Sequence, residues 1–174
     1  FGCSIYYGLT RLSQLIQEYQ GSQPGLWIIE TAEIFDFPIY SLRGITDQQC
    51  HGQVGTVSSM KRFIKFLSRY KNNFLGMNLE DIIGFDEWNN SESLKKINLK
   101  RGAYSSQEIR EVIECGKLYY MDIVPGFQCL GHLENILIHK EYRDLAEFPG
   151  ANCLNLKLQK TYDTLERWLR EICG

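Results

Sequence analysis

The sequence predicts an α/β fold, the first half of a (β/α)8 barrel of the TIM type, and two observations favour it. From Pro38 onward, runs rich in β-branched and aromatic residues alternate with amphipathic helical patterns. Repeated βαβ units imply a parallel sheet with right-handed crossovers. Residues 43–56, RGITDQQCHGQVGT, match neither phosphate-binding glycine pattern that is typical of doubly wound sheets. Three βα units are too few to close a barrel, which needs eight.

Two elements are expected before the barrel. Residues 6–19, YYGLTRLSQLIQEY, carry apolar side chains at helical spacing and predict an amphipathic helix that packs through one face. These side chains are Leu9, Leu12, Leu15, Ile16 and Tyr19. Residues 26–30, LWIIE, predict a short strand.

The first βα unit and the strand of the second are predicted between residues 39 and 104. A buried strand is expected at about 39–46, followed by a helix in VSSMKRFIKFLSRY, for which Thr56 is the N-cap. A second strand is expected at about 73–80. The polar segment that follows, EWNNSESLKKINLKRGAY, predicts a long loop.

The helix of the second unit has a clear start signal. Ser105 and Glu108 form a capping box, and Gly116 marks the expected C-terminal stop of that helix. The strand LYYMDIVP follows at once, at residues 118–125. A last helix is expected at about 160–172.

Composition excludes several classes of function. The chain has 174 residues, a net charge of -2 and 44% hydrophobic residues, which is typical of a globular domain without a general attraction to nucleic acid. No apolar run approaches the ~20 residues that span a bilayer. The first residues, FGCSIYYGLT, lack an initiator Met and a signal-peptide pattern, so an internal start is expected. No cofactor is predicted.

The six cysteines do not predict a metal centre. They include no CxxC pair, and Cys129 and His132, three residues apart, have no second ligand pair at a matching spacing. Small buried thiols are the expectation at most of these positions. Their redox state stays open.

Candidate functional residues stand where the predicted strands end. Arg43 and Asp47 are placed near the end of the first strand, Glu80 and Asp81 at the end of the second, and His132 in the loop after the third. In parallel α/β folds the carboxyl ends of the strands form the active-site face, so these groups are expected to converge there.

Each of these residues also has an ordinary structural interpretation. Arg43 could be a partly buried ion-pair partner, and Glu80 and Asp81 could begin a solvated loop. His132 could cap the next helix. The segment of Asp86, Glu87 and Trp88 is expected to be loop surface.

Four segments together resemble one family of glycosidases. LRGITDQQCHGQVGT, YKNNFLGMNLEDIIGF, RGAYSSQEIREV and MDIVPGFQCLGHLENIL occur in the order and spacing of the barrel of glycoside hydrolase family 20, the β-N-acetylhexosaminidases. YYGLTRLSQLI and FDFPIYSLRG resemble the end of the small α/β domain before that barrel and the junction with it. The resemblance implies a domain boundary with residues 1–35 before the barrel and 36–174 within it.

The resemblance also assigns roles to individual residues. Arg43 is similar to the family arginine that hydrogen-bonds sugar hydroxyls in the -1 subsite, and Asp81 to an aspartate that organises this site. Glu80 stands where many members have Thr or Ser. His132 is similar to the histidine of a Pro-Gly-His-like turn, stretched here to PGFQCLGH. All four are therefore expected to bind substrate.

The resemblance to this family implies exo-acting release of terminal N-acetylglucosamine or N-acetylgalactosamine with retention. In this mechanism the 2-acetamido group of the sugar attacks its own anomeric carbon, assisted by an aspartate and a protonated glutamate. That Asp-Glu pair is expected after Gly174, and Asp86–Glu87 comes too early to replace it. The resemblance implies a glycan containing N-acetylhexosamine as partner, the rest of the barrel to complete the fold, and a secreted, periplasmic or lysosome-like location.

Two other functions stay open at this point. A non-catalytic carbohydrate-binding or structural module derived from the same barrel would keep Arg43, Asp81 and His132 without acid-base chemistry. A related acetamido-sugar hydrolase of the O-GlcNAcase-like type would place an Asp-Asp pair downstream instead.

Overall fold

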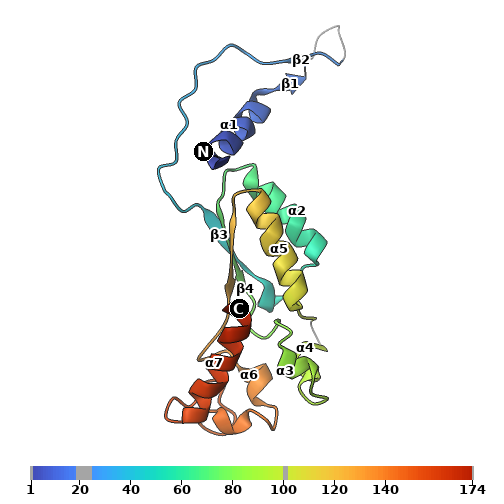
Figure 1. The fold of residues 1–174 in the computed structure, drawn as a ribbon, viewed down its shortest axis with the longest axis vertical. Coiled ribbons are helices and arrows are strands. Elements are labelled where there is room, and N and C mark those ends of the chain that lie inside the picture. Colours follow the sequence, from blue (N-terminus) through green and yellow to red (C-terminus); the bar gives the residue numbers. More distant parts are fainter. Residues whose placement is uncertain (1, 19–24, 100–101, 174) are drawn as a thin grey trace.

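A three-stranded parallel sheet forms the centre of the molecule. The computed structural model describes residues 2–18, 25–99 and 102–173. The strands are β3 (Gly44–Gln48), β4 (Phe74–Asn78) and β5 (Asp122–Gly126), with β4 in the middle. Helices α2 and α5 connect them and lie on the same face of the sheet (Figure 1). The predicted α/β class with a parallel sheet is therefore confirmed.

The strand register aligns the carboxyl ends of the three strands. Gln48 pairs with Asn78, and Asn78 pairs with Gly126, which ends β5. The backbone N–H of Leu79 also donates to the carbonyl of Gly126 at 2.8 Å. The loops that follow the strands consequently leave from one edge of the sheet, called the carboxyl edge below.

The two crossover helices begin as the sequence predicts. In α2 (Val57–Ser68), the Thr56 hydroxyl accepts a hydrogen bond from the N–H of Ser59 at 3.1 Å. In α5 (Ser106–Leu118), Ser105 and Glu108 form the complete capping box. Each cap satisfies backbone donors that have no partner within the helix. The core between helices and sheet contains Met60, Ile64, Leu67, Leu75, Met77 and Val112.

Gly116 does not stop α5, which continues for two more residues. A Cβ at this position would lie 2.6 Å from Cγ1 of Ile123 and 2.7 Å from the carbonyl oxygen of Met121. The glycine is needed because α5 lies directly against β5. Close approach to the sheet, rather than helix termination, explains this residue.

The first strand begins later than predicted. The expected start at residue 39 is wrong, because β3 begins at Gly44, and Ile39 and Tyr40 are 84% and 72% exposed. β4 begins at Phe74, opposite Gly44, so the preceding residues have no strand partner. Their β-branched and aromatic composition is typical of strands, but residues 39–41 form bends without a sheet neighbour.

The third strand is also shorter than predicted. β5 starts at Asp122 rather than at residue 118. The N–H groups of Tyr119, Tyr120 and Met121 donate back to carbonyls at the end of α5, which makes these residues a helix-ending turn. Their aromatic composition, typical of strands, is overridden by this local hydrogen bonding.

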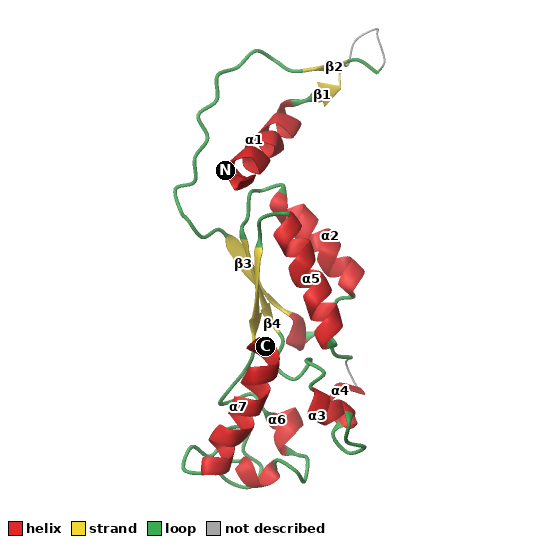
Figure 2. Ribbon diagram, in the orientation of Figure 1, coloured by secondary structure: helices red, strands yellow, loops and turns green. Residues whose placement is uncertain are grey.

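The N-terminal segment forms the expected helix and strand, but the predicted packing is wrong. Helix α1 (Gly2–Leu15) has no buried side chain, and Leu9 and Leu12 are 59% and 43% exposed. Strands β1 (Gln17–Glu18) and β2 (Trp27–Ile28) pair antiparallel. The ring of Tyr6 lies beside those of Tyr119 and Tyr120, with centroids 6.4 and 5.5 Å apart, whereas Leu9 and Leu12 stay exposed. Tyr19 lies outside the described residues. Figure 2 shows the long loop from β2 to β3.

Short helices and the last long helix gather beyond the carboxyl edge (Figure 1). They are α3 (Asp86–Asn89), α4 (Lys95–Leu99), α6 (Glu134–Leu137), α7 (Gln159–Cys173) and the 3-10 turns η1 (Gln49–His51) and η2 (Arg143–Leu145). The prediction of α7 is confirmed. No helix in the described part of the chain has the length and apolarity needed to cross a membrane.

The polar segment after β4 is not a surface loop. Trp88 in α3 is fully buried and meets Phe85, edge to face, with ring centroids 4.7 Å apart. Trp168 of α7 stacks on Phe85 and also meets Trp88 edge to face, with ring centroids 5.9 and 5.8 Å apart. The prediction that Trp88 lies on the surface of a loop is wrong. The polar residues around it in the sequence give no sign of this aromatic core.

Candidate functional site

Asp81 lies just beyond the end of β4, at the carboxyl edge. Its side chain is 4% exposed and accepts a hydrogen bond of 2.9 Å from Nδ2 of Asn135. Asn135 belongs to α6, in the segment that follows β5, so the bond joins two neighbouring βα loops. A buried carboxylate held from a neighbouring loop has a fixed orientation, as a substrate-binding group requires.

Glu80 is buried beside Asp81 in a left-handed backbone conformation, with φ of 43°. The left-handed region is uncommon for a residue with a Cβ. Its Oε1 lies 3.7 Å from Nε2 of His51 and 3.5 Å from Nδ2 of Asn78. The carboxylate therefore faces the loop that follows β3, rather than open solvent.

His132 lies in the loop between β5 and α6, three residues before the Asn135 that binds Asp81. It is exposed and has a φ of 57°. The next residue, Leu133, is buried, and its N–H donates to the carbonyl of Asn152 at 3.0 Å. His132 is thus at the carboxyl edge of the sheet, as are Glu80 and Asp81. The hydrogen bond of Leu133 to Asn152 holds its loop in place.

Arg43 lies at the opposite edge of the sheet, because β3 begins after it. Its Nε donates to the carbonyl of Lys71 at 3.1 Å, and its Nη1 donates to the carbonyls of Tyr40 and Ser41 at 2.8 and 3.1 Å. Its guanidinium also lies over the ring of Tyr7, 5.6 Å from the centroid. The predicted strand end near Arg43 is wrong, and the structure does not bring Arg43 together with the other candidates.

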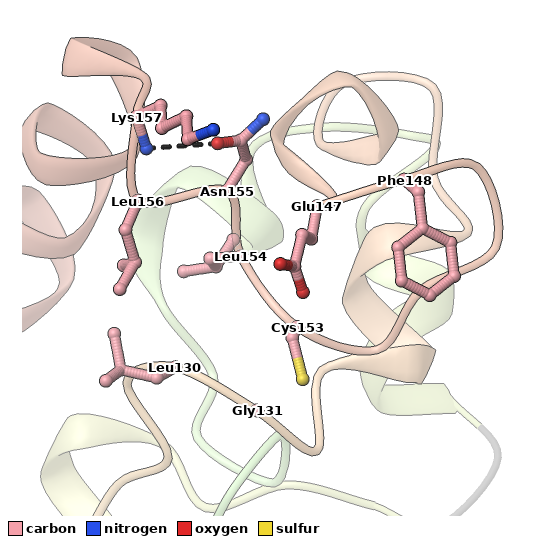
Figure 3. Close-up of a pocket in the computed structure, with 9 residues that line it drawn as sticks. All are labelled: Leu130, Gly131, Glu147, Phe148, Cys153, Leu154, Asn155, Leu156 and Lys157. Atoms are coloured by element: carbon pink, nitrogen blue, oxygen red, sulfur yellow. Dashed lines mark hydrogen bonds between the residues drawn. The ribbon is translucent and has the colours of Figure 1, made fainter.

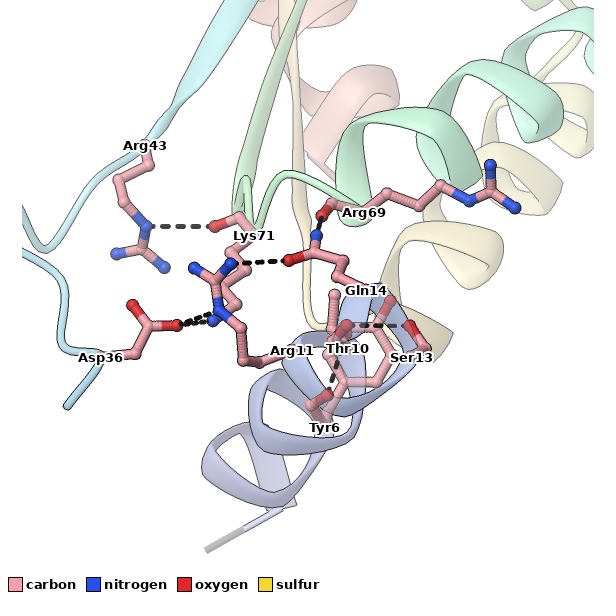
Figure 4. A network of polar contacts seen from close by, with 9 residues as sticks. All are labelled: Tyr6, Thr10, Arg11, Ser13, Gln14, Asp36, Arg43, Arg69 and Lys71. Carbon is pink, nitrogen blue, oxygen red and sulfur yellow. Dashed lines mark hydrogen bonds and ion pairs between the residues drawn. The ribbon is translucent and has the colours of Figure 1, made fainter. Parts of the chain in front are cut away.

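An ion-pair network surrounds Arg43 at this amino edge (Figure 4). Asp36 accepts from Nε of Arg11 at 3.1 Å and from the ammonium group of Lys71. These hydrogen bonds, with that from Lys71 the larger, hold the pKa of Asp36 below its usual value. Gln14 adds a bond to the carbonyl of Arg69 at 2.6 Å. The network connects α1 and the segment before β3 to the turn after α2.

Asp86 and Glu87 form hydrogen bonds that hold neighbouring helices together. The Glu87 carboxylate accepts from the hydroxyl of Tyr142 at 2.5 Å and from the indole N–H of Trp168. Burial first, and then the bond to Glu87, raise the pKa of the Tyr142 hydroxyl well above its usual value. The N–H of Asp86 donates to Oε1 of Glu171 at 2.8 Å. Both residues thereby connect α3 to α7.

A cavity of about 590 Å³ opens beside the loop of His132. Its lining is mixed, with apolar Leu130, Leu156 and Phe148 and the thiol of Cys153 (Figure 3). The backbone N–H of Lys157 is bound to Oδ1 of Asn155 at 3.0 Å. Gly131, next to His132, forms one wall.

Sequence reasoning missed Asn135 as the partner of Asp81. The only signal was its position, three residues after His132 in the same turn segment. An exposed amide on a short helix has no distinctive pattern, and its role depends on the pairing of β4 with β5. That pairing is visible only in three dimensions.

The chain is similar in sequence to several curated proteins, but it matches only part of the length of each. No family model matches the chain. A β-hexosaminidase of Akkermansia muciniphila is 25% identical over 155 residues, which are 82% of this chain and 30% of that protein. β-Hexosaminidase A of Caenorhabditis briggsae is 32% identical over 130 residues, 71% of this chain and 21% of that protein. The chain therefore spans less than a third of the length of these curated relatives.

Solved structures establish the fold. The chitobiase of Flavobacterium johnsoniae matches with a TM-score of 0.80 and 24% identity, over 96% of this chain and 26% of that one. The N-acetyl-β-hexosaminidase of Streptomyces plicatus also gives 0.80, with 23% identity, over 96% of this chain and 37% of that one. Together with the parallel sheet, these matches confirm the fold of the N-terminal part of an α/β barrel.

Proposed function

The chain is a relative, over part of their length, of the β-N-acetylhexosaminidases of glycoside hydrolase family 20, and we propose that it is part of such an enzyme. The proposed reaction is the exo-acting, retaining release of terminal N-acetylglucosamine or N-acetylgalactosamine. The relationship to several hexosaminidases supports this proposal, and so does the position of Asp81 at the carboxyl edge.

The proposed mechanism uses the substrate as its own nucleophile. The carbonyl oxygen of the 2-acetamido group attacks the anomeric carbon, and the bond to the leaving oxygen breaks as that oxygen receives a proton. An aspartate orients the acetamido group and a protonated glutamate supplies the proton. In the proposal, residues beyond this chain contribute that Asp-Glu pair. The proposed domain boundary is separate: residues 1–35 belong to a preceding domain and residues 36–174 to the barrel.

The residues of this chain have positioning and binding roles in the proposal. Asp81, held by Asn135, organises the sugar-binding site at the carboxyl edge. His132 approaches the sugar from the loop after β5, and Glu80 lies beside Asp81. Arg43 has no sugar-binding role in the proposal, because it precedes β3 at the opposite edge of the sheet and binds three backbone carbonyls there.

The single observation that supports the site is the burial of Asp81 between two βα loops. A surface aspartate at the start of a solvated loop would not be 4% exposed and bound to the next loop. The burial gives the carboxylate the fixed direction that differential binding of a transition state needs.

Asp81→Asn in the complete protein tests this role, with Asp122→Asn as the matched control. Asp122 is an exposed carboxylate at the start of β5, at the opposite edge of the sheet. Hydrolysis of a chromogenic N-acetylglucosaminide should fall in kcat/KM by about 10²-fold or more for Asp81→Asn, within the range typical of lost transition-state contacts. The control should keep wild-type kcat/KM.

Two results would contradict the assignment. Equal kcat/KM for the wild type and Asp81→Asn would exclude Asp81 from the site. Sugar binding without turnover in the wild-type protein would favour the non-catalytic carbohydrate-binding module instead. Thermal unfolding of each variant separates a loss of activity from a loss of structure.

A further inference from the structure

We propose that Cys50, His51 and Glu80 form a binding site for Zn²⁺ at the carboxyl edge of the sheet. The strand register explains why these three residues meet. Gln48 ends β3 opposite Asn78, which ends β4. Cys50 and Glu80 each follow two residues later, so adjacent parallel strands deliver them to the same place, and His51 comes next in the η1 turn.

The distances suit one small cation. The Cys50 Sγ, a ring nitrogen of His51 and a carboxylate oxygen of Glu80 all lie within 4.8 Å of one another, and His51 Nε2 to Glu80 Oε1 is 3.7 Å. Tetrahedral zinc, with bonds of about 2.0–2.3 Å, places its ligand atoms roughly 3.3–3.7 Å apart. Modest side-chain adjustment would therefore complete a three-ligand site, while solvent supplies the fourth ligand.

The surroundings of these ligands are rich in acceptor atoms. The Nδ2 of Asn78 donates to Gln48 Oε1 at 2.7 Å, and lies 3.5 Å from both Cys50 Sγ and Glu80 Oε1. Three acceptor groups thus converge on one amide nitrogen, which carries only two hydrogens. A cation at this place would balance the buried carboxylate of Glu80.

The donor set favours zinc over magnesium and calcium. Thiolate and imidazole disfavour magnesium and calcium, which take oxygen ligands, whereas sulfur, nitrogen and oxygen together suit Zn²⁺. Cys50 is fully buried and His51 is exposed, so the histidine side offers the entry path. On binding, the Cys50 thiol gives its proton to solvent, the S–H bond breaks and the Zn–S bond forms.

The test of the zinc site does not depend on the proposed glycosidase reaction. Glu80 is the only member of the zinc site among the proposed sugar-binding residues. Metal binding is measured without any glycoside, so failure of the enzymatic proposal would leave the result of the metal experiment intact.

Metal titration of the full chain tests the proposal, in a background where the exposed thiols are removed by Cys3→Ser and Cys173→Ser. Co²⁺ serves as a spectroscopic probe and Zn²⁺ as its competitor, with the thiols kept reduced. One equivalent of Co²⁺ should give a thiolate charge-transfer band and tetrahedral d–d bands. Zn²⁺ should displace both signals stoichiometrically.

Variants then identify the ligands. Cys50→Ser should abolish the charge-transfer band and weaken Zn²⁺ binding by about 100-fold or more, because even groups outside the metal shell typically account for 10–100-fold. The exposed His51→Gln should weaken binding similarly without disturbing the fold, which circular dichroism verifies. Cys115→Ser, a partly buried thiol on α5, is the matched control and should bind as before.

Two outcomes would overturn the zinc site. The first is an unchanged Zn²⁺ affinity in both Cys50→Ser and folded His51→Gln. The second is the loss of all saturable binding once Cys3 and Cys173 are replaced, which would assign the metal to surface thiols.

Discussion

At the scale of single residues, the carboxyl edge carries two buried carboxylates with different partners. Asp81 is bound by Asn135 from the loop after β5, whereas Glu80 faces His51 from the loop after β3. The side chains of these two adjacent residues therefore face the loops of different strands, Glu80 that of β3 and Asp81 that of β5. This divergence allows one carboxylate to organise a sugar site while the other takes part in a metal site.

Tyr104 offers a pH-dependent test of the loop packing beside this edge. The hydroxyl of Tyr104, with its one hydrogen, lies 3.2 Å from Oε1 of Gln49 and within hydrogen-bond distance of the carbonyl oxygen of Gly55. Burial first, and then the negative charges of Asp47 and Glu108, raise the pKa of Tyr104 from 10.0 to about 12. Because the folded pKa is the higher one, its contribution to stability is complete below pH 10 and is lost as the pH rises toward 12.

Urea unfolding of the wild type and of Tyr104→Phe at several pH values measures this effect. Below pH 10 the variant should be less stable by about 0.5–1.5 kcal/mol, the usual net value of a hydrogen bond. Between pH 10 and 12 the difference should shrink, since only the wild type loses stability by this route. A difference that stays constant across this window would contradict the predicted ionisation.

At the scale of secondary-structure elements, the contact of α5 with β5 requires a glycine. A Cβ at residue 116 would lie 2.6 Å from Cγ1 of Ile123, so Gly116→Ala should destabilise the protein by about 1–3 kcal/mol through overpacking. This penalty exceeds the helix-propensity gain of alanine, about 1 kcal/mol. The free energy of unfolding in denaturant gives the measurement.

Gly8→Ala in α1 is the matched control for that substitution. Nothing lies within 4 Å of a Cβ at residue 8, so the same change of residue in a helix has no steric cost there. The control should leave the unfolding midpoint unchanged or raise it. Equal destabilisation by both substitutions would show that close packing on β5 is not the reason for Gly116.

The sequence predicts elements best where a local signal specifies them. The N-cap Thr56 and the capping box of Ser105 and Glu108 place the starts of α2 and α5 correctly, because each signal is completed within four residues. The starts of β3 and β5 are misplaced by the sequence, because a strand begins where a neighbour pairs with it. Arg43 lies at the amino edge for this reason, although the sequence placed it at the end of β3.

Burial of aromatic residues was also beyond the sequence pattern. Trp88 lies in a polar segment with no helical or alternating period, yet it is enclosed by Phe85, Trp168 and Tyr142. Those partners come from segments as many as 80 residues away. The candidate site was predictable only in part. The position of Asp81 follows from the predicted end of β4, but its hydrogen bond to Asn135 depends on the pairing of β4 with β5.

At the scale of the whole molecule, the parallel order β3-β4-β5 sets the direction of every loop that carries a candidate residue. Helices α2 and α5 cover one face of the sheet, and the short helices and α7 gather beyond its carboxyl edge (Figure 1). The fold matches hexosaminidase structures over 96% of this chain. The account therefore predicts chemistry at the carboxyl edge, completed by the rest of a barrel.

The most direct test of this account compares two chromogenic substrates on the complete protein that contains this chain. One is an aryl β-N-acetylglucosaminide, and the other is the matching β-glucoside, which lacks the acetamido group. Because the acetamido carbonyl is the proposed nucleophile, we expect hydrolysis of the first and a kcat/KM for the second that is lower by about 10³-fold or more. Comparable hydrolysis of both substrates, or hydrolysis of neither, would contradict the proposed function.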